Sequence, residues 1–330
     1  LPRPAAELAE LFYSMRGTLR IEKAARAATP DILYERYNLF YHAGARLARV
    51  RHLPFLLEVN APLAAERAEH GGLTLKRLAD WSETSIWRAA DMVLPVTDVL
   101  AGIIESKGVP RDKIAVIRNG VSAAFLKETD PRPIRARYGL EGKTVLGFTG
   151  FLRAWHGLDR AVRYLGARGD DLRLLIVGDG DDTRARIERL AVSLGVANRV
   201  VITGTVQRED VPAHVGAFDI ALQPAVVPYA SPLKLFEYMA LGRAIVAPAS
   251  ANIRETLTDN VEALLFRPDD DEAFFAALDA LLADRDMRAR LGAAARARLE
   301  RDDLTWAGNA ARVERLAEAT IEQRRSKGGR

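Results

Sequence analysis

LRLLIVGDG, residues 172–180, is the stretch that decides the fold, because an apolar β-branched run ends there in a glycine-rich turn. TVLGFTG (144–150) has the same form. Further short strands are expected at RVVITG (199–204), DIALQP (219–224), AIVAP (244–248) and ALLF (263–266). The segments between them have the apolar spacing of helices. Strands that alternate with helices predict a parallel sheet built from βα units.

The first third of the chain has the same rhythm. Strands are expected there at ILYERY (32–37), PFLLEVN (54–60), DMVLPVT (91–97) and IAVIRN (114–119). The stretch 122–139 holds two prolines within three residues and many charges, which is typical of a linker. We therefore predict an α/β protein with two Rossmann-like domains that face each other across a cleft, where ligands of such folds bind.

The predicted boundaries follow from this pattern. They are a partial N-terminal domain (1–125), a linker (126–140), a C-terminal domain (141–305) and a last helix (306–330). The chain opens with a helical pattern, LPRPAAELAELFYSMRG, instead of a strand and a glycine-rich turn. The sequence therefore predicts that the N-terminal domain is incomplete.

Composition narrows the choice of function. The chain has 330 residues and no cysteine, so disulfides, thiolate zinc sites and thiol catalysis are excluded. Five histidines without a close pair argue against a metal centre, and a net charge of +4 is too small to indicate nucleic acid. No apolar run has membrane-spanning length, which predicts a cytoplasmic protein. Basic runs at 46–52 and 324–330 leave a contact with the inner face of the membrane open, although solvated charge explains them as well.

The segment SPLKLFEYMALGRAIVAP carries the most chemistry. Ser231 is suited to cap a helix and Pro232 to occupy its first position, so the helix would begin at Pro232 and present free backbone N–H groups. Such a helix start binds anions, and Lys234 would add a full positive charge. Glu237, one turn further on, could accept hydrogen bonds from a ribose. The residues alone explain the segment equally well as a surface Lys234–Glu237 ion pair.

Four segments in this order resemble the retaining glycosyltransferases of family 4, which have the GT-B fold. They are VIRNGV (116–121), FTGFLRAWHGLDRAV (148–162), VGDG (177–180) with VVITGTV (200–206), and the segment that begins at Ser231. The first and third are weak signals alone, since glycine turns follow strands in any α/β protein. Their shared order and spacing carry the resemblance. It implies that domain 1–125 is the acceptor side, that domain 141–305 binds the nucleotide-sugar, and that the last helix (306–330) crosses back to the N-terminal domain.

The resemblance implies roles for single residues in binding the donor. Gly150 would allow close approach of the backbone to the donor phosphates, Arg153 would supply charge to the diphosphate, and His156 would assist it. Gly178 and Val206 fall on the strands that bind the base. Ser231, Leu233 and Lys234 form the helix start, and Glu237 falls on the glutamate that binds the ribose. Tyr229 stands where the family usually has a second glutamate that touches the sugar, so this chain departs from the pattern there.

The first domain offers one polar pair. Glu58 and Asn60 alternate with Val59 at the end of an expected strand, so their side chains share one face. They are the candidate catalytic residues, because the family places contacts to the acceptor or the reacting sugar in this loop. A pair that merely caps the loop explains them equally well.

The resemblance implies a metal-independent glycosyltransferase that moves a sugar from a nucleotide diphosphate-sugar to an acceptor hydroxyl with retention. No cofactor is expected, since the nucleotide-sugar is a substrate. The acceptor could be a glycan, a lipid-linked sugar or a small molecule, in polysaccharide or glycoconjugate biosynthesis. Two alternatives stay open at this point: a sugar-nucleotide epimerase of the same fold, and a non-catalytic nucleotide-binding or scaffold fragment.

Overall fold

The computed structural model describes residues 3–69 and 71–328, and these residues form two compact units. The first unit comprises Leu1–Arg118, Tyr229–Ser231 and Asn309–Arg330, and the second comprises Asn119–Pro228 and Pro232–Gly308. Residues 119–125, expected in the first domain, therefore group with the second unit. The cause is local, because Val121 pairs with the chain next to Thr305: its N–H donates to Leu304 O (3.0 Å), and Trp306 N–H donates to Val121 O (3.2 Å).

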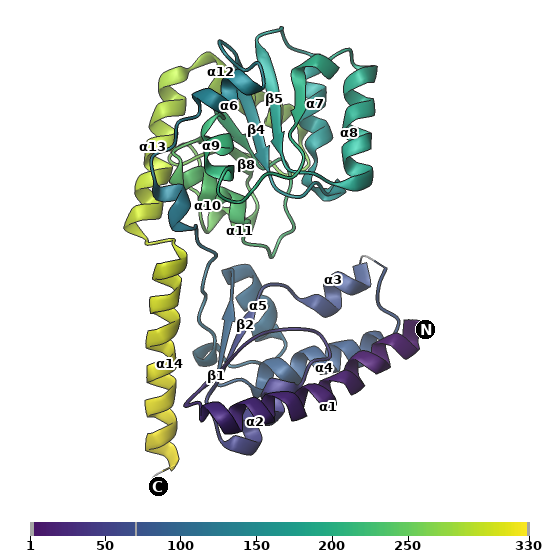
Figure 1. Ribbon diagram of the computed structural model, residues 1–330, viewed down its shortest axis with the longest axis vertical. Coiled ribbons are helices and arrows are strands. Elements are labelled where there is room, and N and C mark those ends of the chain that lie inside the picture. The colour runs from purple at the N-terminus through teal and green to yellow at the C-terminus, as the bar shows by residue number, and fades with distance from the viewer. Residues whose placement is uncertain (1–2, 70, 329–330) are drawn as a thin grey trace. The chain divides into compact units, whose positions relative to one another are not determined.

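The second unit is built on a six-stranded parallel sheet (Figure 1). Its strands are β4 (Thr144–Thr149), β5 (Leu172–Val177), β6 (Val200–Ile202), β7 (Ile220–Leu222), β8 (Ala244–Pro248) and β9 (Leu264–Phe266). The order β6-β5-β4-β7-β8-β9 reverses direction between β4 and β7. This is the doubly wound arrangement, in which ligands bind at the carboxyl ends of the strands beside the point of reversal. The predicted parallel sheet is confirmed.

Helices cover both faces of this sheet. They are α6 (Arg132–Arg137), α7 (Leu158–Gly166), α8 (Asp181–Ser193), α9 (Val211–Gly216), α10 (Leu233–Ala240), α11 (Ala251–Arg254), α12 (Asp271–Ala283) and α13 (Arg285–Arg301), with short 3₁₀ turns at Ala123–Leu126, Ala154–His156 and Ala197–Arg199. Successive strand residues point to opposite faces. Leu146 and Phe148 of β4 accordingly join the core under α7, α8 and α12, whereas Val145 joins the core under α9, α10 and α13.

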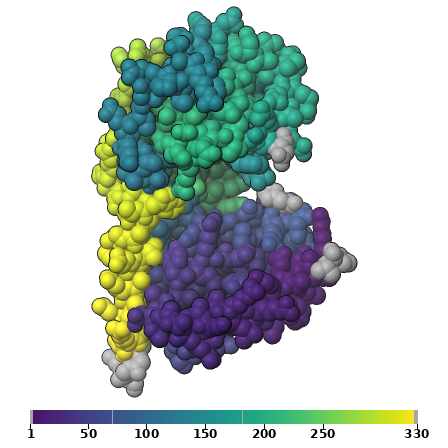
Figure 2. All heavy atoms as spheres, in the orientation of Figure 1, coloured from purple at the N-terminus to yellow at the C-terminus, as the bar shows by residue number. Residues whose placement is uncertain are grey.

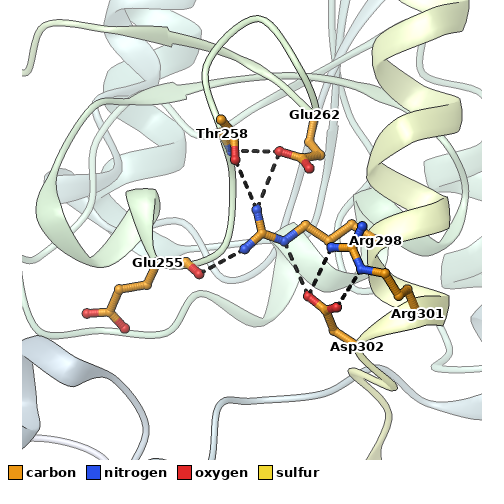
Figure 3. Close-up of polar contacts among 6 residues, drawn as sticks. All are labelled: Glu255, Thr258, Glu262, Arg298, Arg301 and Asp302. Carbon is orange, nitrogen blue, oxygen red and sulfur yellow. Dashed lines mark hydrogen bonds and ion pairs between the residues drawn. The ribbon is translucent and has the colours of Figure 1, made fainter.

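A close contact and a polar network hold α13 against the rest of this unit. A Cβ on Gly292 would lie 2.1 Å from Gly242 O, so only glycine allows α13 to approach the turn after α10 this closely. Further along α13, the Arg298 guanidinium donates to Thr258 Oγ1 (3.1 Å) and to the main-chain oxygen of Glu255 (3.3 Å), and it pairs with Glu262 (3.5 Å) (Figure 3). The Glu262 carboxylate is buried and also accepts from Thr258 N–H (2.8 Å).

The first unit contains a three-stranded parallel sheet in the order β1-β2-β3. The strands are β1 (Leu33–Arg36), β2 (Phe55–Val59) and β3 (Met92–Pro95), and the helices are α1 (Arg3–Ala28), α2 (Ala43–Arg51), α3 (Leu63–Glu69), α4 (Lys76–Ala89) and α5 (Asp98–Ser106), with a 3₁₀ turn at Arg111–Lys113. Phe55, Leu57 and Trp87 are fully buried in its core. The last helix, α14 (Trp306–Gly328), is held to this unit by Arg324, which donates to both carboxylate oxygens of Asp91.

The strand predicted at 114–119 is wrong. This segment runs beside β3, and Ala115 N–H donates to Val93 O (3.0 Å) while Ile117 N–H donates to Pro95 O (2.9 Å). Only Ile114 forms a ladder bridge, with Val93. The segment follows β3 as far as Ile117 and then leads into the second unit, which begins at Asn119. Within the part of the chain that the structure describes, no helix is long and apolar enough to span a bilayer.

Candidate functional site

The helix that carries Lys234 and Glu237 begins beside the point where the sheet order reverses. α10 follows β7, and its first intrahelical bond runs from Leu235 N–H to Pro232 O (3.1 Å). Pro232 is therefore the N-cap residue, and the prediction that Ser231 caps this helix is wrong. Ser231 is buried one position earlier, and its segment, Tyr229–Ser231, groups with the first unit.

Tyr238 fixes α10 against the two strands at the reversal. Its buried hydroxyl accepts a hydrogen bond from Thr149 N–H at the end of β4 (3.0 Å). The same hydroxyl donates to Leu222 O at the end of β7 (3.4 Å). One side chain therefore ties the helix to both strand ends, which places the first turn of α10 over the carboxyl edge of the sheet.

Two glycine turns lie at the carboxyl ends of β4 and β5, next to the start of this helix. Gly150 follows β4 with φ of 125°, and Gly178 follows β5 with φ of 146°, conformations that side chains rarely allow. A Cβ on Gly178 would lie 2.2 Å from Gly150 O, so the two turns are in direct contact. A Cβ on Gly150 would lie 3.5 Å from Lys234 Cε. The backbone at Gly150 is therefore bare and lies against the Lys234 side chain.

Lys234 and His156 meet over the same aromatic ring. Lys234 Nζ lies 4.7 Å from the centroid of the Phe148 ring, and the His156 ring centroid lies 5.1 Å from it. Burial lowers the pKa of Lys234 to about 8, against the opposing effect of the Glu237 carboxylate. Burial, with the charges of Lys234 and Arg153, lowers the pKa of His156 to about 3. At neutral pH Lys234 is therefore mostly charged and His156 is neutral.

Arg153 lies on the solvent side of this group. Its guanidinium stacks on Phe151 (4.4 Å to the ring centroid) and Trp155 (5.6 Å), and the residue is exposed. Arg153 N–H donates to His156 Nδ1 (3.2 Å). Because Nδ1 accepts that bond, the neutral ring carries its proton on Nε2, where it can donate to a ligand. His156 thus offers a hydrogen bond and not a charge.

Glu237 lines a pocket beside α10. The pocket has a volume of about 360 Å³, and its walls include Val121, Phe125, Arg208, Leu233, Glu237 and Trp306. Burial raises the pKa of Glu237, while the charges of Lys234 and Arg208 act in the opposite direction. Glu237 therefore lies within electrostatic reach of both cations. A flat apolar group that carries hydroxyls and hydrogen-bond acceptors would fit these walls.

Arg208, Phe125 and Trp306 were missed by sequence reasoning, because they come from three segments far apart in the chain. The position of Arg208, two residues after Val206 in a predicted base-binding strand, was the one available signal. Val206 itself lies beyond the end of β6 (Val200–Ile202) and not on a strand as predicted, and it is half-buried against the core under α10. Leu233, by contrast, is 50% exposed at the pocket wall.

The predicted polar pair of the first unit forms a small network of its own. Asn60 Nδ2 donates to Glu58 Oε1 (2.7 Å), and Tyr34 OH donates to Glu58 Oε2 (2.5 Å). Arg36 lies 3.8 Å from Glu58. Tyr229 is also held in this unit, where its main-chain oxygen accepts from Thr97 Oγ1 (2.9 Å) and its hydroxyl bonds Glu66. Both oxygens of Glu58 are therefore engaged in the absence of any substrate.

Over residues 3–69 and 71–328, no group of three His, Cys, Asp or Glu side chains is placed to hold a metal ion. The site instead combines a cation, neutral donors, bare glycine backbone and a carboxylate, which together suit a phosphorylated, hydroxyl-bearing ligand.

Comparison with known families finds one match in each half of the chain. Residues 143–284 match the model of glycosyl transferases group 1, and residues 1–120 match the glycosyl transferase 4-like domain. Both ranges are therefore similar to glycosyltransferase domains, and the parallel sheets of the chain match the GT-B fold of solved glycosyltransferases.

Individual relatives are distant. Over 257 residues the chain is 24% identical to the alpha-D-kanosaminyltransferase of Streptomyces kanamyceticus, a match that spans 74% of this chain and 65% of that protein. Over 300 residues it is 27% identical to the GDP-mannose-dependent alpha-(1-6)-phosphatidylinositol monomannoside mannosyltransferase of Mycolicibacterium smegmatis, spanning 88% and 78%. HepE of Anabaena in complex with UDP superposes with a TM-score of 0.81 at 17% identity, over 92% of this chain and 82% of that one. The first match thus covers slightly less than two thirds of its relative.

Proposed function

We propose that this protein is a glycosyltransferase that moves a sugar from a nucleoside diphosphate-sugar to an acceptor hydroxyl with retention of configuration and without a metal. The observation that carries the proposal is the position of Lys234 over the bare Gly150 turn, with Glu237 one turn further along the same helix. The solved neighbour HepE holds UDP, and the mycobacterial relative uses GDP-mannose. UDP and GDP are therefore the ligands to test.

In this proposal the diphosphate lies at the start of α10. Lys234, Arg153, the Nε2–H of His156 and the free N–H groups of the helix start would neutralise its charge. The bond between the anomeric carbon and the diphosphate oxygen breaks as the acceptor oxygen forms its bond to the same carbon. The acceptor proton passes to the leaving diphosphate. Charge stabilisation of that leaving group is the contribution of these residues to catalysis.

The nucleoside would occupy the pocket beside α10. Glu237 would accept the two ribose hydroxyls, with Leu233 and Trp306 beside the base and Arg208 donating to its carbonyl edge. The main chain at Gly178 and Val206 adds further groups for the base. In the first unit, Glu58 and Asn60 are the proposed contacts to the reacting sugar or the acceptor, which could be a glycan, a lipid-linked sugar or a small molecule.

Calorimetry with UDP and with its 2′,3′-dideoxy analogue tests the ribose assignment. The unmodified protein should bind UDP about tenfold more tightly than the analogue, because this is the contribution expected from a hydrogen bond to a charged group. Glu237→Gln should lose this preference. Glu209→Gln, which removes another carboxylate from the same pocket wall, should keep it. Equal preference in Glu237→Gln and the unmodified protein would disprove the role of Glu237.

Turnover tests the reaction itself. A panel of UDP- and GDP-sugars is incubated with the protein and mixed acceptors, and transfer is followed by mass spectrometry, with the anomeric configuration read by NMR. Nucleotide binding without transfer or hydrolysis of any donor would favour a non-catalytic protein, and conversion of UDP-N-acetylglucosamine to an epimer would favour an epimerase.

A further inference from the structure

The ammonium of Lys234 lies on the face of an aromatic ring. Its Nζ is 4.7 Å from the centroid of Phe148, the last residue but one of β4. Phe148 is fully buried, so the surface of the second unit in Figure 2 contains none of its ring. The face of such a ring attracts a cation, and the attraction is stronger where the cation is desolvated, as burial makes Lys234. The ring therefore holds the ammonium electrostatically.

The protein offers this ammonium no hydrogen-bond acceptor. Among the residues that the structure describes, no hydrogen bond or ion pair engages Lys234 Nζ. Glu237 is one turn further along α10, yet it forms no ion pair with Lys234 and acts on it only through its charge. The three N–H donors of the ammonium therefore remain available to a ligand.

A second cation over aromatic rings shows how unusual this arrangement is. The Arg160 guanidinium lies 5.3 Å from the ring centroids of both Phe266 and Phe274. It also pairs with the carboxylate of Asp271 (2.5 Å). The charge of Arg160 is thus neutralised within the unit. Lys234 has the aromatic ring without a bonded carboxylate, which suits a cation that must pair with an anionic ligand.

The ring lies next to the bare glycine turn. Gly150 follows Phe148 by two residues, and a Cβ on Gly150 would lie 3.8 Å from Lys234 Nζ. The His156 ring packs on the same phenyl ring, with 5.1 Å between the centroids. Any large apolar side chain could fill the core at position 148. An aromatic side chain also fixes the position of one cation and one neutral hydrogen-bond donor.

We propose that Phe148 is a positioning residue, whose ring holds the Lys234 ammonium beside the Gly150 turn and keeps its N–H donors available to the donor diphosphate. Phe148 touches no substrate itself, because it is fully buried. A lysine side chain that is held in place before binding loses less conformational entropy when the ligand arrives. The inference rests on the proposed function, and it adds the group that keeps Lys234 in position.

The ring should also affect the protonation of Lys234. Its negative face favours the ammonium over the neutral amine, so a weaker face lowers the pKa of Lys234. The other charges at this place are Glu237 on α10, which favours the ammonium, and Arg153, which acts together with Lys234 on the neutral His156. A change confined to the ring leaves these groups as they are. The affinity for UDP should then begin to fall at a lower pH.

Fluorinated phenylalanines at position 148 test the proposal on the whole chain. Fluorine withdraws charge from the ring face and hardly changes the size of the ring, so one, two and three fluorine atoms weaken the attraction in steps. Calorimetry should show an affinity for UDP that falls in the same order, to about one fifth with three fluorine atoms. Uridine, which has no phosphate, should bind equally well throughout. Phe148→Leu would also remove the ring face, but it would leave a cavity in the core.

The same fluorination in Lys234→Met separates positioning from packing. The affinity of Lys234→Met for UDP should not change with fluorination, because the ring has no ammonium to hold. Phe236 provides a matched control, since it is fully buried on α10 and no cation lies over its ring within the described part of the chain. Its fluorination should leave the affinity for UDP unchanged. An equal loss of affinity in either of these proteins would overturn the proposal.

Failure of this inference and failure of the proposed function give different results. Absence of UDP binding to the unmodified protein, or equal binding by Lys234→Met, would overturn both. Weak binding by Lys234→Met together with unchanged binding across the Phe148 series would overturn the inference alone. Thermal melting of each fluorinated protein, expected to be unchanged, excludes unfolding as the cause.

Discussion

The affinity for a nucleotide should depend on pH, because burial lowers the pKa of Lys234, whose positive charge is proposed to bind the diphosphate. With a pKa of about 8, the ammonium of the free protein is mostly charged at about pH 7 and mostly neutral at about pH 9. A bound diphosphate favours the charged form and raises the pKa in the complex. The affinity for the nucleotide is therefore highest below the pKa of Lys234 in the free protein, and it falls as the pH rises through that pKa.

The size of the effect follows from the same pKa. The charged fraction of Lys234 falls about tenfold between pH 7 and pH 9, so the affinity for UDP should fall about tenfold, or ~1.4 kcal/mol. His156 adds nothing to this change, because its pKa of about 3 keeps it neutral throughout the range.

Calorimetry with UDP at both pH values checks the prediction. Lys234→Arg keeps its charge at both values and should show no comparable fall, whereas Lys234→Met should bind weakly at both. Ionisation of UDP itself is common to all three proteins, so it cancels in the comparison. Uridine, which has no phosphate, should show no difference between Lys234→Arg and the unmodified protein. Parallel loss of UDP affinity in Lys234→Arg and the unmodified protein would refute the reasoning.

Two further predictions concern stability. Gly178→Ala should destabilise the second unit by about 3 kcal/mol or more and lower its Tm. The added Cβ would lie 2.2 Å from Gly150 O, and the backbone at this position has a positive φ that alanine rarely adopts. An unchanged Tm would contradict the contact between the two turns. Arg298→Ala should cost about 3 kcal/mol, because it leaves the buried Glu262 carboxylate unpaired (Figure 3). Arg301→Ala is the control: it removes an exposed ion pair from the same helix and should change the free energy of unfolding by less than about 0.5 kcal/mol. Equal Tm values for the two variants would rule out the Arg298 network as a source of stability.

Strands and helices were predictable where the pattern is local. Residues 174–177 of LRLLIVGDG are buried and form a continuous apolar run, and β5 (Leu172–Val177) forms there as expected. The segment 114–119 is apolar over its first four residues, but it bonds β3 at Ala115 and Ile117 without forming a continuous ladder. An apolar pattern indicates burial, and it does not show whether a segment will form a ladder with its neighbour.

The N-cap of α10 also shows that a local pattern can fail to predict the structure. Ser231 has the side chain of a good cap, and local chemistry favours it in that role. In the structure its segment is held by the first unit, so the chain reaches helical geometry only after Pro232. A contact made with distant residues thus overrides the local preference.

The sequence by itself determined that βα units form a parallel sheet and that a lysine and a glutamate follow one strand at helical spacing. These are local properties, set by the alternation of strand side chains and the pitch of a helix. Only the tertiary structure decided that Lys234 lies over the bare backbone of Gly150 and that Arg208, Phe125 and Trp306 enclose Glu237. The physical reason is that the order of strands in the sheet, and the bond of Tyr238 to two strand ends, bring together residues that no local pattern connects.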